Sequence, residues 1–145
     1  MRRLGKMPGW QKSLVTIGML SCSLTGSLYL LGHEWQIGRA VFANHTILAS
    51  HGLSAILATL ALGSILPFHI KVGYQSGRKR LSGFSQLVFM LILLTTGGLL
   101  YYGPAETRDL VIYFHWVVGL SFFASFLCHG VIKWGLPILR KSTVQ

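Results

Sequence analysis

Acidic residues are almost missing from this chain. Only 3 of its 145 residues are Asp or Glu, against 13 Lys and Arg, and charged residues make up 11% of the total. An ordinary soluble domain has roughly a quarter of its residues charged, so this composition does not suit one. Two cysteines cannot form a disulfide scaffold of the usual kind. A hydrophobic content of 52% excludes a disordered chain, and the length allows about one domain.

Long apolar runs take the place of the missing charges. Four stretches contain no Asp, Glu, Lys or Arg, and they cover about residues 13–31, 46–70, 84–102 and 110–132. Each can cross a hydrocarbon core about 30 Å thick as a helix, the form in which a backbone in lipid satisfies its own hydrogen bonds. The short loops make successive helices antiparallel neighbours. We therefore predict an all-α fold, with residues 1–145 forming one membrane domain that is a four-helix transmembrane bundle.

The basic residues lie mostly on one side of these spans. Eleven share that side: Arg2, Arg3, Lys6, Lys12, Lys71, Arg78, Lys79, Arg80, Lys133, Arg140 and Lys141. The other side has Arg39 and Arg108, together with all three acids, Glu34, Glu106 and Asp109. The positive-inside rule then predicts that both termini are cytoplasmic. The net charge of +10 becomes a rim that favours anionic lipid headgroups, and it does not indicate nucleic-acid binding.

The first span is expected to stay in the protein as a helix. It follows a basic segment, as a signal peptide would, but its apolar run is longer than usual and lacks a clean cleavage site. A short N-terminus without a transit peptide suits a bacterial inner (cytoplasmic) membrane.

Histidine is costly inside a membrane span and is a functional-site hypothesis by default. His33 and His45 lie in or beside the first outer loop, where we expect solvated or interfacial side chains. The other four histidines lie in or at the ends of two spans: His51 and His69 in the second, His115 and His129 in the fourth.

The spacing of these four histidines places them in pairs. His51 and His69 are 18 residues apart, which is five helical turns, and His115 and His129 are 14 apart, about 40° short of four turns. Each pair shares one helix face. His51 and His115 both lie five residues from the outer ends of their spans, and the other two lie at the inner ends. We expect two cross-helix pairs, one near each membrane surface, with Pro67 as a possible source of a kink.

Two neutral imidazoles that face each other across a bundle make a bis-histidine axial pair for haem iron. Basic residues could bind the propionates, Arg39 or Arg108 for an outer haem and Arg78 or Lys133 for an inner one. Glycines next to or facing the histidines would let the ring approach the backbone: Gly52, Gly97, Gly98, Gly119 and Gly130. The absence of Cys-x-x-Cys-His excludes covalent c-type attachment. Cys22 and Cys128 are expected to be small core residues.

Other interpretations of the histidines stay open. They could be satisfied polar residues that bridge helices. A zinc site is disfavoured, because no carboxylate or thiolate cluster completes four ligands. The first and second halves of the chain look like two copies of one hairpin, each with histidines on its second helix. This repeat supports the pairing of the histidines across the two helices.

The chain resembles the small four-helix di-haem cytochromes b, which include the cytochrome b561-type and related bacterial membrane proteins. The resemblance covers about residues 13–134 and rests on the depth-matched histidines, on the run Thr95-Thr96-Gly97-Gly98-Leu99-Leu100-Tyr101, and on His115-Trp116-Val117-Val118-Gly119. It implies b-type haems with His51, His69, His115 and His129 as ligands. It also implies electron transfer across the membrane, commonly to or from quinones. If His69 is not a ligand, one outer haem remains.

The resemblance leaves the electron donor and acceptor open. Acids and tyrosines at the outer end could exchange protons with a quinone, or simply make a wet loop: Glu34, Tyr101, Tyr102, Glu106 and Asp109. No nucleotide motif or nucleophile–base pair is present, so we expect an electron-transfer subunit of a larger redox complex rather than a stand-alone catalyst. The alternatives are a structural subunit, a (bacterio)chlorophyll-binding subunit and a small transporter.

Overall fold

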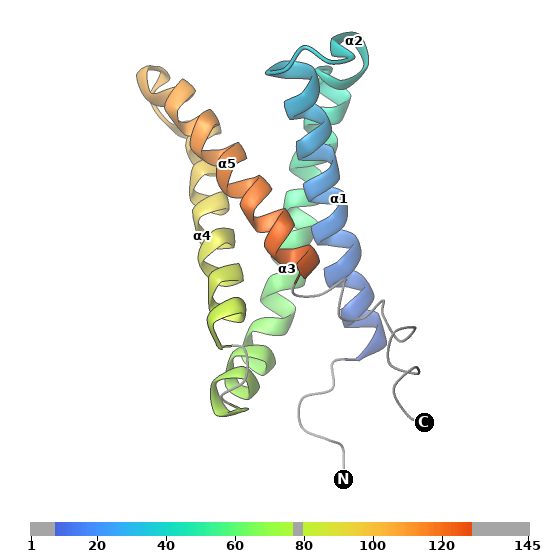
Figure 1. The fold of residues 1–145 in the computed structure, drawn as a ribbon, viewed down its shortest axis with the longest axis vertical. Helices are drawn as coiled ribbons and strands as arrows, with labels where there is room; N and C mark the ends of the chain where they lie inside the picture. Colours follow the sequence, from blue (N-terminus) through green and yellow to red (C-terminus); the bar gives the residue numbers. More distant parts are fainter. Residues whose placement is uncertain (1–7, 77–79, 129–145) are drawn as a thin grey trace, which may run out of the picture. The chain divides into compact units, whose positions relative to one another are not determined.

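The structure is a computed structural model that describes residues 8–76 and 80–128, with side chains described for residues 8–67 and 83–128. Every regular element in these ranges is helical, which confirms the all-α prediction for them. The elements are listed in chain order: α1 (Gly9–His33), α2 (Arg39–Phe42), α3 (His45–Ser76), α4 (Arg80–Tyr102), the 3-10 helix η1 (Ala105–Thr107) and α5 (Arg108–Phe126) (Figure 1).

Four helices in the described ranges are long and apolar enough to cross a membrane. α1, α3 and α4 contain the first three predicted spans, although α1 begins four residues earlier and α3 continues six residues further than the apolar runs. α5 covers residues 110–126 of the fourth predicted span. The added residues, 9–12 and 71–76, include the lysines and glutamines at which the apolar runs stop, and the helical hydrogen bonding continues through them. Residues 129–132 of the fourth predicted span lie outside the described residues.

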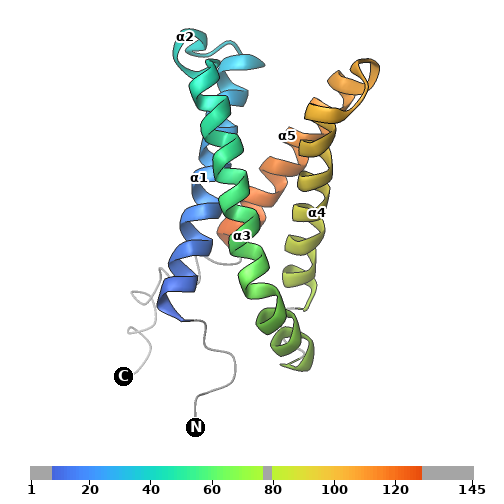
Figure 2. The same cartoon turned by 180° about the vertical axis from the view of Figure 1, so that it is seen from behind.

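The chain divides into two compact units, residues 1–83 and 84–145. The first holds α1, α2 and α3, and the second holds α5 and nearly all of α4. Within each unit the two long helices run antiparallel, as the short connections predict: α1 and α3 lie side by side, whereas α4 and α5 diverge from their common loop end (Figures 1 and 2). Assembly of the two hairpins into one four-helix bundle, and a cytoplasmic location for both termini, stay predictions.

Small residues bring α1 and α3 close together. A Cβ atom built on Gly18 would lie 3.3 Å from both the Cα and the backbone nitrogen of Ala58. Ala58 and Ala61 are fully buried, and Val15 and Met19 of α1 are buried as well. Small residues at such an interface let two helix backbones approach, which is how membrane helices gain packing energy without a hydrophobic driving force.

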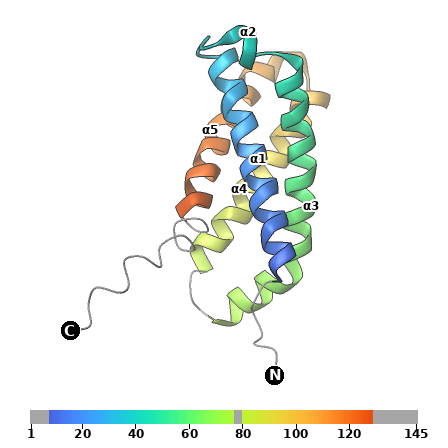
Figure 3. The same ribbon diagram turned by 90° about the vertical axis from the view of Figure 1, so that its right-hand side faces the viewer.

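A short helix covers the loop end of the first unit. The segment between α1 and α3 contains α2, which folds back against the end of α1 (Figure 3). Gly32 makes this possible, since a Cβ there would lie 2.6 Å from the backbone nitrogen of Ala43. Gly38 precedes α2 with φ of +60°, a left-handed conformation that favours glycine. The ring of Phe42 lies against Gly38, so the segment is held to the hairpin by backbone and side-chain contact.

The loop end of the second unit is shorter. The backbone N–H of Gly103 donates to the carbonyl of Leu99 at 2.8 Å and closes α4. Pro104 then precedes η1, which leads directly into α5. At the opposite end, Gln86 Nε2 donates to Ser125 Oγ at 2.7 Å and joins the two helices.

Apolar side chains are exposed along the spans, as they are on a surface that faces lipid. Leu53, Ile56 and Leu60 follow one stripe of α3 and are each more than 60% exposed. A patch of this kind would promote aggregation in water, whereas in hydrocarbon it is the outer surface.

Pro67 lies inside α3, within the predicted second span. Proline has no N–H, so the carbonyl one turn earlier, at Gly63, loses its usual helical donor. A Cβ on Gly63 would meet nothing within 4 Å, so this part of the helix is also open to its surroundings.

Candidate cofactor site

His51 lies in the second turn of α3, and its ring is held by α1. Its Nδ1 atom lies 3.0 Å from the carbonyl oxygen of Cys22. A carbonyl can only accept, so Nδ1 is the donor. The same nitrogen lies 3.4 Å from Thr25 Oγ1 and 3.8 Å from Cys22 Sγ. His51 is therefore tied to the neighbouring helix through one side of its ring.

Gly26 provides the space for this ring. A Cβ built on Gly26 would lie 2.8 Å from Cε1, 3.1 Å from Nδ1 and 3.5 Å from Nε2 of His51. No real side chain fits at 2.8 Å unless something shifts. Gly26 is thus part of the surface on which the imidazole rests.

His115 has the equivalent place in the second unit. It lies in the second turn of α5, and its Nδ1 atom is 2.8 Å from Thr96 Oγ1 on α4. A Cβ on Gly97 would lie 3.7 Å from Cε1 of His115, an ordinary van der Waals distance. The second histidine is therefore held in the same way as the first, with a looser contact to its glycine.

Each unit also contains a second polar contact between its two long helices, at the end away from the loop. Gln11 Nε2 donates to the backbone carbonyl of Ser64 at 2.7 Å, with Ser64 Oγ at 3.4 Å. The matching contact in the second unit is the hydrogen bond from Gln86 to Ser125. Each hairpin thus has a Thr–His contact near its loop and a Gln–Ser contact near its other end, which supports the internal repeat expected from the sequence.

The sequence analysis missed Thr25 and Gly26, and it named Thr96 only as part of the run on which the resemblance rests. Thr25-Gly26 and Thr96-Gly97 are the only two Thr-Gly dipeptides in the chain, and one precedes each histidine-bearing helix. That repetition was a usable signal. A Cβ on Gly52 or Gly98 would meet nothing within 4 Å, so the space beside both glycines is open and their expected role beside a haem stays a prediction. Gly119 faces a leucine side chain, Leu93, at 3.7 Å.

The side chains of the two predicted inner ligands, His69 and His129, are not among those that the structure describes. The backbone of His69 belongs to α3, but its side chain is not among those described. His129 lies outside the described residues, as do Arg78, Gly130 and Lys133.

The outer arginines are present at the loop ends. Arg39 begins α2 and Arg108 begins α5, and both are exposed. Arg108 precedes His115 by seven residues, about two helical turns, so each hairpin carries an arginine on the loop side of its histidine.

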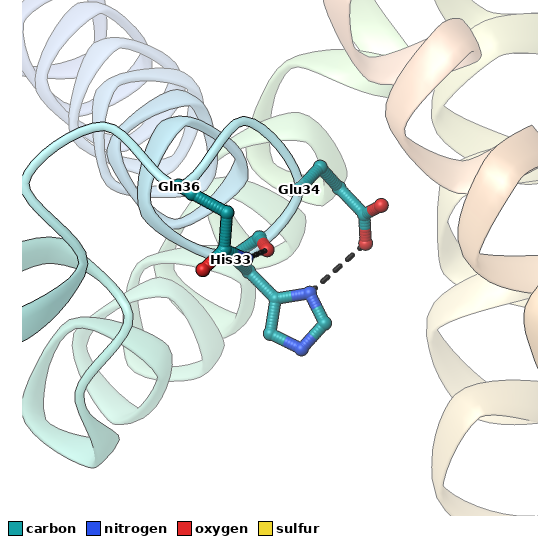
Figure 4. A network of polar contacts seen from close by, with 3 residues as sticks. All are labelled: His33, Glu34 and Gln36. Carbon is teal, nitrogen blue, oxygen red and sulfur yellow. Dashed lines mark hydrogen bonds and ion pairs between the residues drawn. The ribbon is translucent and has the colours of Figure 1, made fainter.

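The remaining histidines are exposed, as expected for solvated residues. His33 Nδ1 lies 2.9 Å from Glu34 Oε1, and Gln36 Nε2 donates to the His33 carbonyl (Figure 4). The His33 ring also stacks on Tyr29 with centroids 5.4 Å apart. These contacts are local to the end of α1. His45 is exposed at the start of α3.

The acids and tyrosines at the loop ends are solvent-accessible. Tyr101 and Tyr102 are 76% and 93% exposed, and Glu106 and Asp109 are exposed in the same unit. Of the two cysteines expected in the core, Cys22 is half-buried against His51, whereas Cys128 is exposed. The expectation was wrong for Cys128, which follows the last turn of α5, where the described helix ends.

No three side chains of His, Cys, Asp or Glu come together as a metal-binding group among the residues that the structure describes. His51 and His115 each offer an imidazole that is oriented by a hydrogen bond at Nδ1. Comparisons with protein-family models, with curated proteins and with solved structures find no match to this chain.

Proposed function

We propose that the chain is a b-type membrane cytochrome that transfers electrons, with His51 and His115 as axial ligands of a haem iron. The observation that carries this proposal is the shared setting of the two histidines. Each lies in a membrane-length helix, and each engages the neighbouring helix through Nδ1. Metal-ligating histidines almost always donate their second ring N–H to such an acceptor, which fixes the ring and raises the basicity of the ligating nitrogen.

The donor set fits haem better than other metal groups. Two neutral imidazoles satisfy both axial positions of haem iron, whose four equatorial ligands come from the porphyrin. A bound haem would supply a one-electron iron couple. The chain's own residues would hold the iron through the two histidines, and Arg39 and Arg108 would bind the propionates. The apolar spans would keep water from the ring.

A second haem nearer the cytoplasm belongs to the same proposal, with His69 and His129 as ligands. Arg78 and Lys133 would lie at its propionates. Positive charge near that haem stabilises the reduced form and raises its potential. Two haems would form a relay between the two membrane surfaces.

The proposal includes an inner-membrane protein with both termini in the cytoplasm, working with other redox subunits and exchanging electrons with a quinone. Substitution Glu106→Gln tests the quinone part. Slower quinol-driven haem reduction at unchanged haem content would support it, and unchanged kinetics in Glu106→Gln, Asp109→Asn and Tyr101→Phe would contradict it.

The second candidate is a structural subunit in which the histidines bridge helices. The same two hydrogen bonds favour it, because a bridging histidine also bonds to its neighbour helix. A third, a (bacterio)chlorophyll-binding subunit, would use one histidine for each pigment rather than opposing pairs, so the depth matching of the four membrane histidines argues against it.

An absorption spectrum separates these candidates. The chain would be expressed in a haem-producing bacterium, purified in detergent, and measured as a dithionite-reduced minus oxidised spectrum with pyridine haemochrome quantification. We expect a b-type spectrum with two haems for each chain, or one if the inner pair is not a ligand pair. Protein that is helical and monodisperse but contains no haem would overturn the cytochrome proposal.

A further inference from the structure

Four threonine hydroxyls in the described helices donate to the backbone of their own helix. Thr25, Thr59, Thr95 and Thr96 each place Oγ1 within 2.9 Å of the carbonyl four residues earlier. A hydroxyl has one proton and two lone pairs. Once Thr96 donates to the Ile92 carbonyl, its oxygen meets His115 Nδ1 as an acceptor. The proton between Thr96 and His115 is therefore on the imidazole.

The first unit reaches the same result through its backbone. The acceptor for His51 Nδ1 is the carbonyl oxygen of Cys22, which has no proton to give. Thr25 Oγ1 lies further away, at 3.4 Å, and itself donates to the Ser21 carbonyl at 2.7 Å. Both histidines therefore carry their proton on Nδ1, although the acceptor is a main-chain group in one unit and a side chain in the other.

We propose that Thr96 and the Cys22 carbonyl are positioning groups that favour the Nδ1–H tautomer of His115 and His51, in which Nε2 is the nitrogen that would bind iron. The identity of the metal group rests on the proposed function. The tautomer itself does not, because the hydrogen bonds are made by the protein alone.

The two acceptors differ in how they respond to mutation. Thr96→Val is nearly the same shape as threonine and removes the hydroxyl that accepts from His115. Thr25→Val is the matched control at the equivalent site, and it leaves the Cys22 carbonyl in place. Thr96→Ser keeps a hydroxyl at the same position and should restore the wild-type behaviour.

The first test uses the haem-free protein in lipid nanodiscs, with ¹⁵N-labelled histidine and each ring assigned by a single His→Gln variant. We expect Nδ1 protonated and Nε2 unprotonated for His51 and His115. Thr96→Val should shift His115 away from this pattern and leave His51 unchanged, whereas Thr25→Val and Thr96→Ser should change neither. An Nε2–H tautomer or an imidazolium at His115 in the wild type would overturn the inference, as would an unchanged His115 in Thr96→Val.

The second test uses the haem-loaded protein and measures the midpoint potential. Loss of the acceptor makes His115 a weaker donor to ferric iron, so Thr96→Val should have a higher potential than wild type at equal haem content. Thr25→Val and Thr96→Ser should keep the wild-type potential. A simple packing role for Thr96 would not move the potential.

The two failures are distinguishable. Expected tautomers in a folded protein that binds no haem would contradict the cytochrome and leave the hydrogen-bond assignment intact. Bound haem with a potential that does not respond to Thr96→Val would contradict the positioning role and leave the cytochrome standing.

Discussion

The imidazole of His51 rests on Gly26 so closely that a methyl group cannot come between them. A Cβ at position 26 would lie 2.8 Å from His51 Cε1, whereas the equivalent distance from position 97 to His115 is 3.7 Å. The two units therefore share one arrangement of threonine, glycine and histidine but differ in how tightly they are packed. That difference allows one unit to serve as the control for the other.

Gly26→Ala should be harmful and Gly97→Ala should be tolerated. The alanine methyl at 26 must displace the His51 ring or separate α1 from α3, and overpacking of this kind costs about 1–3 kcal/mol. Gly97→Ala meets only an ordinary contact, so it should be neutral or should gain up to about 1 kcal/mol, as alanine does when it replaces glycine in a helix. Thermal unfolding in detergent measures the stability, and haem content measures the ligand. Equal behaviour of the two variants would contradict the packing difference.

Gly18→Ala should destabilise the first unit, and Gly63→Ala should not. An alanine at 18 would press against the backbone of Ala58 at 3.3 Å, where no side chain can move aside. Position 63 is open, so alanine there should give the gain of about 0.5–1 kcal/mol usual when it replaces glycine in a helix. Denaturant titration of the two variants checks the opposite signs.

The two glutamine contacts should give different coupling energies. Gln86 bonds to the Ser125 hydroxyl, so a Gln86→Ala, Ser125→Ala double-mutant cycle should yield about 0.6 kcal/mol, typical for membrane proteins. Gln11 bonds chiefly to the Ser64 backbone, so the Gln11→Ala, Ser64→Ala cycle should be close to zero. Similar values for both cycles would show that the assigned acceptors are wrong.

Substitution of single histidines should separate ligands from bystanders. His51→Ala and His115→Ala should each lose the outer haem, because one axial ligand does not hold a bis-histidine haem in place. His33→Ala and His45→Ala should keep the wild-type spectrum, since both side chains are exposed at helix ends. Haemochrome content for each chain is the measurement. A full complement of haem in His51→Ala would remove His51 from the ligand set.

The membrane topology can be tested with single cysteines after both native cysteines are replaced by alanine. We expect a membrane-impermeant thiol reagent to label Gln36→Cys in intact cells and to spare Ser142→Cys until the cells are opened. The positive-inside rule predicts this result from the eleven basic residues on one side. Labelling of Ser142→Cys but not Gln36→Cys in intact cells would contradict the predicted topology and indicate the opposite orientation.

The helices were the predictable part of the structure. An apolar run long enough to cross lipid leaves a backbone few options, so the spans at 13–31 and 84–102 appear inside α1 and α4. The ends were not predictable in the same way. Helical hydrogen bonds continue α3 to Ser76, whereas hydropathy marks only the end of the apolar run at residue 70 and gives no sign of where the helix ends.

The candidate site was predictable in its histidines and not in what holds them. Depth and helix face follow from spacing along one chain segment, which is why His51 and His115 could be selected. The acceptor for His51 is a main-chain carbonyl 29 residues away, and carbonyls have no sequence signature. Thr96 and Gly26 are set by packing across a hairpin, although the repeated Thr-Gly dipeptide did mark both places.

Pro67 divides α3 into a part that is fixed against α1 and a part that can bend more easily. Above it, His51 is fixed by α1 through a hydrogen bond and a glycine contact. Below it, the helix continues past a carbonyl that has lost its donor, so bending at this point costs less free energy than bending of an intact helix. His69 comes two residues after this joint. The direction in which His69 extends from the helix axis is therefore not fixed by that of His51 five turns earlier. A change in bend angle at Pro67 can move His69 while His51 stays in place.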